Sequence, residues 1–359
     1  MNIMKGKCNM ARVMIDLDDT TREQVQGFLN DERFSGSPIA IMPDAHAGKG
    51  SCVGFTMPVG KYVMPATIGV DIGCGVQSRN YGKVDLDVVE FDKMVKAKIP
   101  MGFSVHIKPV TIVATPDADY YGYDRAMCSL GTLGGGNHFI EAGRDSEGNL
   151  WITVHTGSRK LGLEVEGYYT KVAEELAEKY MMRYPCLPVC SDEYVAYQTD
   201  MIITQKYARH NRDTIFSLLD MGEAVKIIDT VHNYINYNDS IIRKGAVSAY
   251  EGEWLLIPFN MRDGIAICKG KGNKEWNYSA PHGAGRVLSR VQAKKQLSVE
   301  AFLTTMRDHN VYTTTAGINT LDEAPGAYKS KHLIVDAIKD TVGIVDYIIP
   351  IYNCKAGGD

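Results

Sequence analysis

The stretch ATIGVDIGCGVQSRNY, residues 66–81, sets the pattern for the first half of the chain. It holds two short apolar runs, Ala66–Ile72 and Val76–Tyr81, with glycines between them that mark a tight turn. Short apolar runs bounded by glycine are typical of buried strands. The same pattern returns along this half and predicts further strands at Ser37–Met42, Cys52–Pro58 and Trp151–Val154.

Outward from these strands, helical and strand-like segments alternate. Apolar residues at helical spacing predict helices over Leu86–Ile99, Leu163–Tyr184 and Asp192–Leu219. Two β-rich stretches come next, followed by three predicted helices: Ile241–Tyr250 and Trp254–Cys268, then Arg286–Gln296, Ser298–Arg307 and Lys331–Thr341. No internal repeat and no proline- or serine-rich linker divides the chain. The sequence therefore predicts an α+β fold in a single domain, residues 1–359.

Glycine is the residue type in excess. The 359 residues include 35 glycines, about 10% against a usual ~7%. The formal net charge of −4 differs from the basic surplus of a typical nucleic-acid-binding protein. No apolar run reaches the roughly 20 residues of a membrane span, and the N-terminus lacks the apolar stretch of a signal peptide, which favours a cytoplasmic protein. The eight cysteines include no Cys-x-x-Cys pair, so we expect free thiols.

Some of the nine histidines stand beside glycine clusters. His46 lies in MPDAHAGKG, His138 follows GGGN, His155 opens HTGSR and His282 opens HGAGR. Glycine beside a reactive side chain lets the backbone approach a ligand closely or adopt a positive φ, so these are the candidate functional histidines. Others stand in ordinary contexts, where a solvated or hydrogen-bonded side chain is expected: His106, His210, His309 and His332.

The turn at residues 69–75 presents a carboxylate, Asp71, and a thiol, Cys74. Taken alone, Cys74 is a small buried apolar residue and Asp71 a turn former. With the histidines, however, they make the ligand set of a borderline divalent ion such as zinc or manganese. His138, His155 and, from the polar aromatic run VHNYINYN, His232 would bring the ligands to five. That is too many for one tetrahedral ion, so two adjacent ions are predicted, which suits phosphoryl chemistry.

His282 is framed by small residues, with Arg286 four positions further on. A nucleophile or a general acid would be presented in this way, with a partner for phosphate beside it. Residues 259–290 hold six basic and two acidic side chains, so basic charge gathers around His282 in the sequence. Such a run is otherwise read as a solvated face.

Five motifs, in one order, resemble the RtcB family of GTP-dependent RNA-splicing ligases. They are MPDAHAGKG (42–50), GVDIGCG (69–75), GTLGGGNHFIE (131–141), HTGSR (155–159) and HGAGR (282–286). AYK at 327–329 and Lys355 extend the match to nearly the whole chain. The resemblance implies one domain of mixed sheets surrounded by helices, with the metal and nucleotide site in a central cleft.

The resemblance also implies a reaction. In such ligases a histidine, here His282, attacks the α-phosphate of GTP, releases pyrophosphate and becomes a covalent guanylyl-histidine. GMP then passes to an RNA 3′-phosphate, after a 2′,3′-cyclic phosphate end has been opened, and a 5′-hydroxyl end of RNA is joined. The expected co-substrate is GTP and the expected cofactor is Mn²⁺, as two ions. The sequence leaves open an activating protein partner and the choice between tRNA splicing and RNA repair.

The resemblance assigns roles residue by residue. The manganese ligands are Asp71, Cys74, His138, His155 and His232. The nucleotide contacts are Asn137, Phe139, Glu141, Gly283, Ala284, Gly285, Tyr328 and Lys355, where the carboxylate of Glu141 suits the N–H edge of guanine. The residues close to the metals or the incoming RNA are Asp44, Arg159 and Arg286.

Two features depart from the family pattern. PFNMRDG, residues 258–264, stands where a Gly-Ser-Met-Gly-like nucleotide loop is expected, and AGGD follows Lys355. Two other functions stay open: a dinuclear metal-dependent phosphoesterase that forms no covalent nucleotide, and an inactive subunit that binds RNA ends. Zinc or cobalt would also satisfy sulfur and imidazole ligands.

Overall fold

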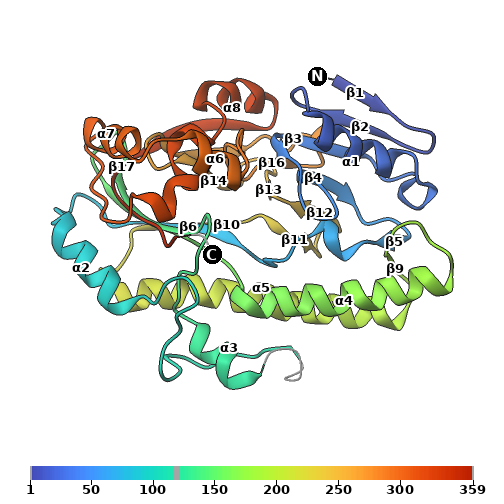
Figure 1. Ribbon diagram of the computed structural model, residues 1–359, viewed down its shortest axis with the longest axis horizontal. Coiled ribbons are helices and arrows are strands. Elements are labelled where there is room, and N and C mark those ends of the chain that lie inside the picture. Colours follow the sequence, from blue (N-terminus) through green and yellow to red (C-terminus); the bar gives the residue numbers. More distant parts are fainter. Residues whose placement is uncertain (1, 117–121, 358–359) are drawn as a thin grey trace.

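A computed structural model describes residues 2–116 and 122–357 (Figure 1). One of its two large sheets has six strands and comes mainly from the N-terminal part of the chain. Strands β2 and β3 run parallel, and the other neighbours are antiparallel. The strand order is β1 (Asn2–Lys5), β2 (Met10–Val13), β3 (Ile39–His46), β4 (Val53–Pro58), β12 (Ile241–Lys244) and β11 (Asn233–Asn236).

The second large sheet has seven strands, all antiparallel to their neighbours. Its order is β10 (Lys226–Val231), β6 (Gly75–Asn80), β8 (Leu150–Thr156), β7 (Phe139–Arg144), β17 (Val342–Cys354), β15 (Gly264–Gly270) and β14 (Trp254–Asn260). Two short pairs complete the strands: β13 (Ala246–Ser248) with β16 (Ser279–Pro281), and β5 (Tyr62–Val63) with β9 (Leu187–Pro188).

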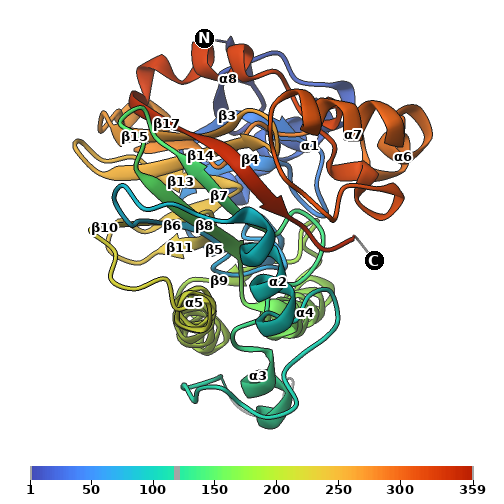
Figure 2. The ribbon, with the colours of Figure 1, turned by 90° about the vertical axis from the view of Figure 1, so that its left-hand side faces the viewer.

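Helices cover the sheets on both sides. Two long helices, α4 and α5, run beneath the sheets, and α6, α7 and α8 lie on the opposite side (Figure 1). Figure 2 looks along α4 and α5 and shows α3 projecting beyond them, away from the sheets. The bounds are α1 (Asp19–Leu29), α2 (Val88–Lys98), α3 (Tyr123–Ser129), α4 (Arg159–Lys179), α5 (Asp192–Leu219), α6 (Arg290–Gln296), α7 (Val299–Asp308) and α8 (Lys331–Ala337).

Helix α5 contributes to two parts of the apolar core. Its first half places Tyr197 and Met201 in the cluster beneath the six-stranded sheet. Its second half places Ile215 and Phe216 in the cluster beneath the seven-stranded sheet. One helix thus joins both sheets, as expected when a chain folds as one unit. The mixed α+β fold is confirmed, and the single domain stays a prediction.

Most predicted elements are present with shifted ends, but the strand at Ala66–Ile72 is wrong. Residues Pro65–Thr67 form a 3₁₀ turn, and an irregular loop then leads to β6. Gly69 and Gly73 in this loop have φ values of +93° and +74°, which an extended strand does not allow. No helix among the described residues is long and apolar enough to cross a membrane.

The predicted helix at Arg286–Gln296 begins four residues later than expected. Ser289 caps α6: its hydroxyl accepts a hydrogen bond from the backbone N–H of Gln292, whose side chain bonds back to Ser289. Arg286 therefore lies in the loop before α6.

Candidate active site

A cavity of about 340 Å³ collects residues that are far apart in the sequence. It is lined by the loop before β6, the start of β7, the end of β8, the β14–β15 hairpin and the loop after β16. Fourteen residues to which the sequence gave roles line it: Asp71, Cys74, Asn137, Phe139, Glu141, His155, His232, His282, Gly283, Ala284, Gly285, Arg286, Tyr328 and Lys355. Three others, His138, Arg159 and Asp44, lie behind the lining.

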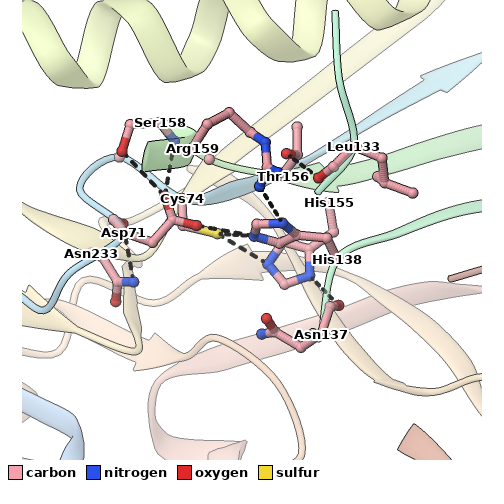
Figure 3. A network of polar contacts seen from close by, with 12 residues as sticks. Asp71, Cys74, Leu133, Asn137, His138, His155, Thr156, Ser158, Arg159 and Asn233 are labelled. Atoms are coloured by element: carbon pink, nitrogen blue, oxygen red, sulfur yellow. Dashed lines mark hydrogen bonds and ion pairs between the residues drawn. The ribbon is translucent and has the colours of Figure 1, made fainter. Parts of the chain in front are cut away.

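Five of these side chains form what we call the thiol–imidazole cluster: Asp71, Cys74, His138, His155 and His232. The Sγ of Cys74 lies 3.4 Å from the Nε2 atoms of both His138 and His155 (Figure 3). The Nε2 of His155 is also 3.4 Å from the Nε2 of His232. All four of these side chains are buried, so the thiol and the imidazoles face one another without solvent between them.

Asp71 holds the cluster against the start of α4. Its Oδ2 lies 3.0 Å from the Nε2 of His138, and its Oδ1 accepts a hydrogen bond from the backbone N–H of Ser158 (Figure 3). Burial alone would raise the pKa of Asp71, but the hydrogen bond and charge of His138 and the charge of Arg159 lower it to about 2. Gly157 permits this contact, because a Cβ there would lie 2.2 Å from Oδ1 of Asp71.

Arg159 supports His138 from behind. Its Nη1 lies 3.4 Å from the Nδ1 of His138, and its Nη2 donates to the backbone carbonyl of Gly102. The backbone of Arg159 has a φ of +57°, a left-handed conformation that costs a non-glycine residue on the order of 1 kcal/mol or more. This strain occurs where the chain turns from the cluster into α4.

The cluster residues have altered proton affinities. Burial raises the pKa of the Cys74 thiol well above its usual value, and the charge of Asp71 adds to this. Burial also lowers the pKa values of His155 and His232 far below the usual value. Two of the imidazoles are thus held neutral, which is the state that binds a metal.

The donor atoms form two groups that both include Cys74, and each group could hold a metal ion. Cys74, His155 and His232 have ligand atoms within 4.8 Å of one another, and so do Asp71, Cys74 and His138. The Nδ1 of His155 lies 3.1 Å from the backbone carbonyl of Asn137, which directs Nε2 into the cluster. Sulfur, imidazole and carboxylate together suit zinc or manganese, as the sequence predicts.

His282 lies next to the cluster, although its position in the sequence sets it apart. The ring centroids of His282 and His232 are 4.8 Å apart. The Nδ1 of His282 lies 2.5 Å from Oδ2 of Asp44, a fully buried carboxylate that also accepts from the backbone N–H of His282. Asp44, expected near the metals or RNA, contacts His282 and orients its ring, and its predicted role stays a prediction. Gly285 is needed here, because its φ is +71° and a Cβ would lie 2.2 Å from the carbonyl of Asp44.

A second group, which we call the Glu323 cluster, consists of Arg286, Glu323, Tyr328 and Lys355. The carboxylate of Glu323 is fully buried and lies 3.1 Å from both Nη1 of Arg286 and Nζ of Lys355. It also accepts a hydrogen bond from the hydroxyl of Tyr328. Burial alone would raise the pKa of Glu323, but the charge of Lys355, the Tyr328 hydrogen bond and the charge of Arg286 hold it below its usual value.

Sequence reasoning missed Glu323. Arg286, expected beside a phosphate, lines the cavity and pairs with Glu323, and its role at a phosphate stays a prediction. Glu323 precedes the AYK motif by only a few residues, yet nothing in its own neighbourhood marks it as buried. In the 258–264 segment, which departs from the family pattern, Arg262 and Asp263 form an ion pair with each other. Neither side chain lines the cavity.

Three further residues lie around the cavity: His46, a candidate functional histidine to which the sequence gave no specific role, and two lysines that were given none. His46 lines the cavity, with Nδ1 2.9 Å from the carbonyl of Asp44. Lys244 is buried and donates to the carbonyls of residues 49, 51 and 66, while Lys329 donates to those of residues 43 and 45. The two lysines thus fix both ends of the segment that carries Asp44 and His46. Burial lowers the pKa of Lys244 to about 8.

The fold and the cavity define a mixed α+β protein with two groups of candidate metal ligands beside an oriented histidine. Comparison with known proteins gives the family. The sequence model described as tRNA-splicing ligase RtcB matches residues 32–120 and 111–356. The chain belongs to the RtcB family.

Two relatives show how far the similarity extends. The RNA-splicing ligase RtcB of Escherichia coli (strain K12) is 30% identical over 376 residues, which cover 89% of this chain and 90% of that protein. The tRNA-splicing ligase RtcB of Archaeoglobus fulgidus is 26% identical over 424 residues, which cover 88% and 87%. The resemblance found in the motifs is confirmed.

Proposed function

We propose that this protein joins RNA 3′-phosphate or 2′,3′-cyclic phosphate ends to 5′-hydroxyl ends, using GTP and Mn²⁺, through a guanylyl group on His282. The observation that carries the proposal is the placement of His282 between Asp44 and the thiol–imidazole cluster. Family membership and the names of the relatives support an RNA ligase. We also propose that the whole chain acts as one domain.

Asp44 gives His282 the tautomer that a nucleophile needs. With the proton on Nδ1 shared with the Asp44 carboxylate, Nε2 keeps its lone pair. That nitrogen forms a bond to the α-phosphorus of GTP while the bond from phosphorus to the pyrophosphate oxygen breaks, and pyrophosphate leaves. The negative charge of Asp44 stabilises the positive charge that develops on the ring, as the third member of a catalytic triad does.

The next two steps transfer the guanylyl group to the RNA 3′-phosphate and then join the two RNA ends. An oxygen of the RNA 3′-phosphate attacks the phosphorus of the guanylyl group, and the bond to Nε2 breaks. The 5′-hydroxyl oxygen of the second RNA then attacks the 3′-phosphorus, and GMP leaves as the new phosphodiester forms. Metal ions held by the thiol–imidazole cluster would neutralise phosphate charge when bound. Tyr328 and Lys355 would hold the nucleotide, and Arg159 would keep His138 in place.

The test is covalent labelling. Incubating the protein with GTP labelled at the α-phosphate and with Mn²⁺ should attach one GMP per chain, and peptide mass spectrometry should locate it on His282. His282→Ala should abolish the label, whereas His210→Ala should not, because His210 is exposed on α5. Label that survives His282→Ala contradicts the proposal. Hydrolysis of a phosphate ester without any label would favour the phosphoesterase.

A further inference from the structure

Two buried oxygen atoms of cavity-lining residues have no hydrogen-bond partner: Oε1 of Glu141 and Oδ1 of Asn353. Glu141 is 2% exposed and Asn353 is 1% exposed. A buried acceptor left without a donor costs about 1–3 kcal/mol. A pair of them in one cavity indicates that a ligand supplies the missing hydrogens. The resemblance gives Asn353 no role.

The pairing of strands explains why these two residues meet. Asn353 on β17 lies directly opposite Glu141 on β7, and directly opposed side chains lie on the same face of a sheet. The Nδ2 of Asn353 donates to Oε2 of Glu141 over 2.8 Å. This bond uses one atom of each side chain and leaves the two remaining oxygens free. An irregularity in β17 between Pro350 and Tyr352 sets the register that brings Asn353 to this place.

The walls beside this pair are apolar and partly aromatic. Phe139 precedes Glu141 by two residues on β7, and Pro258, Phe259 and Ile265 come from the β14–β15 hairpin. Flat apolar walls with a few polar atoms suit a planar heterocycle. Guanine presents two adjacent donors on one edge, N1–H and the 2-amino group, whereas inosine lacks the amino group.

We propose that Asn353 is a specificity-determining residue for the nucleotide: its Oδ1 accepts a hydrogen bond from the 2-amino group of guanine while Glu141 accepts from N1–H. The proposal rests on the proposed use of GTP. N1–H is the more acidic donor and so is matched to the carboxyl group. Burial raises the pKa of Glu141 to about 8, against the opposing effects of Asn353 and Lys355, and a hydrogen bond from N1–H would favour its ionised form.

Binding of GTP and inosine triphosphate separates this role from a structural one. Calorimetry would use Mn²⁺-loaded chain carrying His282→Ala, so that no group transfer occurs. We expect Asn353→Leu to lower the preference for GTP over inosine triphosphate by about tenfold, because only GTP loses a hydrogen bond. Asn353→Ala gives the same readout if leucine is not accommodated.

Two variants serve as controls. Asn353→Asp should keep the preference within about threefold, because two adjacent carboxyl groups share a proton and still present two acceptors. Tyr352 lies next to Asn353 on β17 and donates a hydrogen bond to Asp92 on α2; Tyr352→Phe loses this bond and should leave the preference unchanged. The proposal is overturned if Asn353→Leu weakens the binding of GTP and of inosine triphosphate equally. It is also overturned if Asn353→Asp lowers the preference for GTP as much as Asn353→Leu does. Failure of wild-type labelling by GTP would instead count against the proposed function.

Discussion

The thiol–imidazole cluster and the Glu323 cluster share one cavity but balance their charges in opposite ways. The first brings together a protonated thiol and two neutral imidazoles, and the atoms that could bind a metal face one another. The second surrounds a single carboxylate with the cations of Arg286 and Lys355. The first therefore offers its lone pairs to an added metal ion, whereas the carboxylate of the second is already paired with cations of the chain itself.

Removing the shared ligand should have the largest effect. In Cys74→Ala both donor groups lose their common atom, so we expect loss of bound Mn²⁺ and at least a ~100-fold slower GMP labelling. Metal analysis after dialysis and the labelling rate would measure this. Cys190→Ala, at an exposed thiol, is the matched control. If Cys74→Ala still binds two ions tightly per chain, metal binding does not depend on the shared thiol. The contrast between the two clusters would then be lost.

Neutralising the second cluster should cost less activity and more stability. Glu323→Gln leaves Arg286 and Lys355 without their shared buried anion, so we expect the free energy of unfolding to fall by about 3 kcal/mol. KM for GTP should rise about tenfold with a smaller change in kcat, because Lys355 and Tyr328 lose their anchor. Urea unfolding and labelling kinetics would measure both. Mn²⁺ content should not change, and its loss would show that the clusters depend on each other.

Glu141 is a buried carboxyl group without an ion pair, and so contrasts with the carboxylate of Glu323. Its pKa is about 8 in the folded chain and near 4.5 when unfolded. The folded state therefore holds the proton more tightly. This contribution to stability is fully present below about pH 4.5 and is lost as the pH rises through 8.

The expected sign can be checked with Glu141→Gln, which cannot titrate. Relative to this variant, the metal-free wild type should lose stability between pH 5 and pH 9, on the order of a few kcal/mol. Urea unfolding at each pH in the presence of a chelator would measure it. A difference that stays constant with pH would show that Glu141 is ionised throughout.

The smallest effect is expected at the rim of the Glu323 cluster. The Nζ of Lys294 lies 3.8 Å from Oδ1 of Asp322, and the lysine side chain is 42% exposed. Because water and salt screen such a pair, Lys294→Met should change the free energy of unfolding by less than about 1 kcal/mol. A change comparable to that of Glu323→Gln would mean that the cluster extends to the surface.

Much of the fold was predictable where the signals are local. The predicted helix over Asp192–Leu219 agrees with α5 at both ends, because Ser191 caps its start and Asp220 ends it in a left-handed conformation. β17 was not predicted. Pro350 interrupts its apolar pattern, and its neighbours β7 and β15 come from distant parts of the chain, so its place depends on pairing that no local pattern records.

The residues of the candidate site also divide into those with a local sequence signal and those placed by long-range contacts. Asp71, Cys74, His138 and His155 stand in glycine-rich motifs, and the structure brings them together, although their roles stay predictions. Glu323 and Asn353 stand in no such motif. Their burial and partners follow from strand register and from ion pairs with residues far away in the sequence. A single sequence shows the residue types but not these distances.

The position of β17 also has a consequence for how the protein is made. This strand joins β7 to β15 and so connects the two parts of the seven-stranded sheet. Because residues 342–354 leave the ribosome after every other strand of that sheet, the edges of β7 and β15 stay unpaired until this strand has emerged. Such non-local pairing is slow and exposes the nascent chain to aggregation. A growing chain therefore completes its cavity only once Asn353 and Lys355 have emerged together.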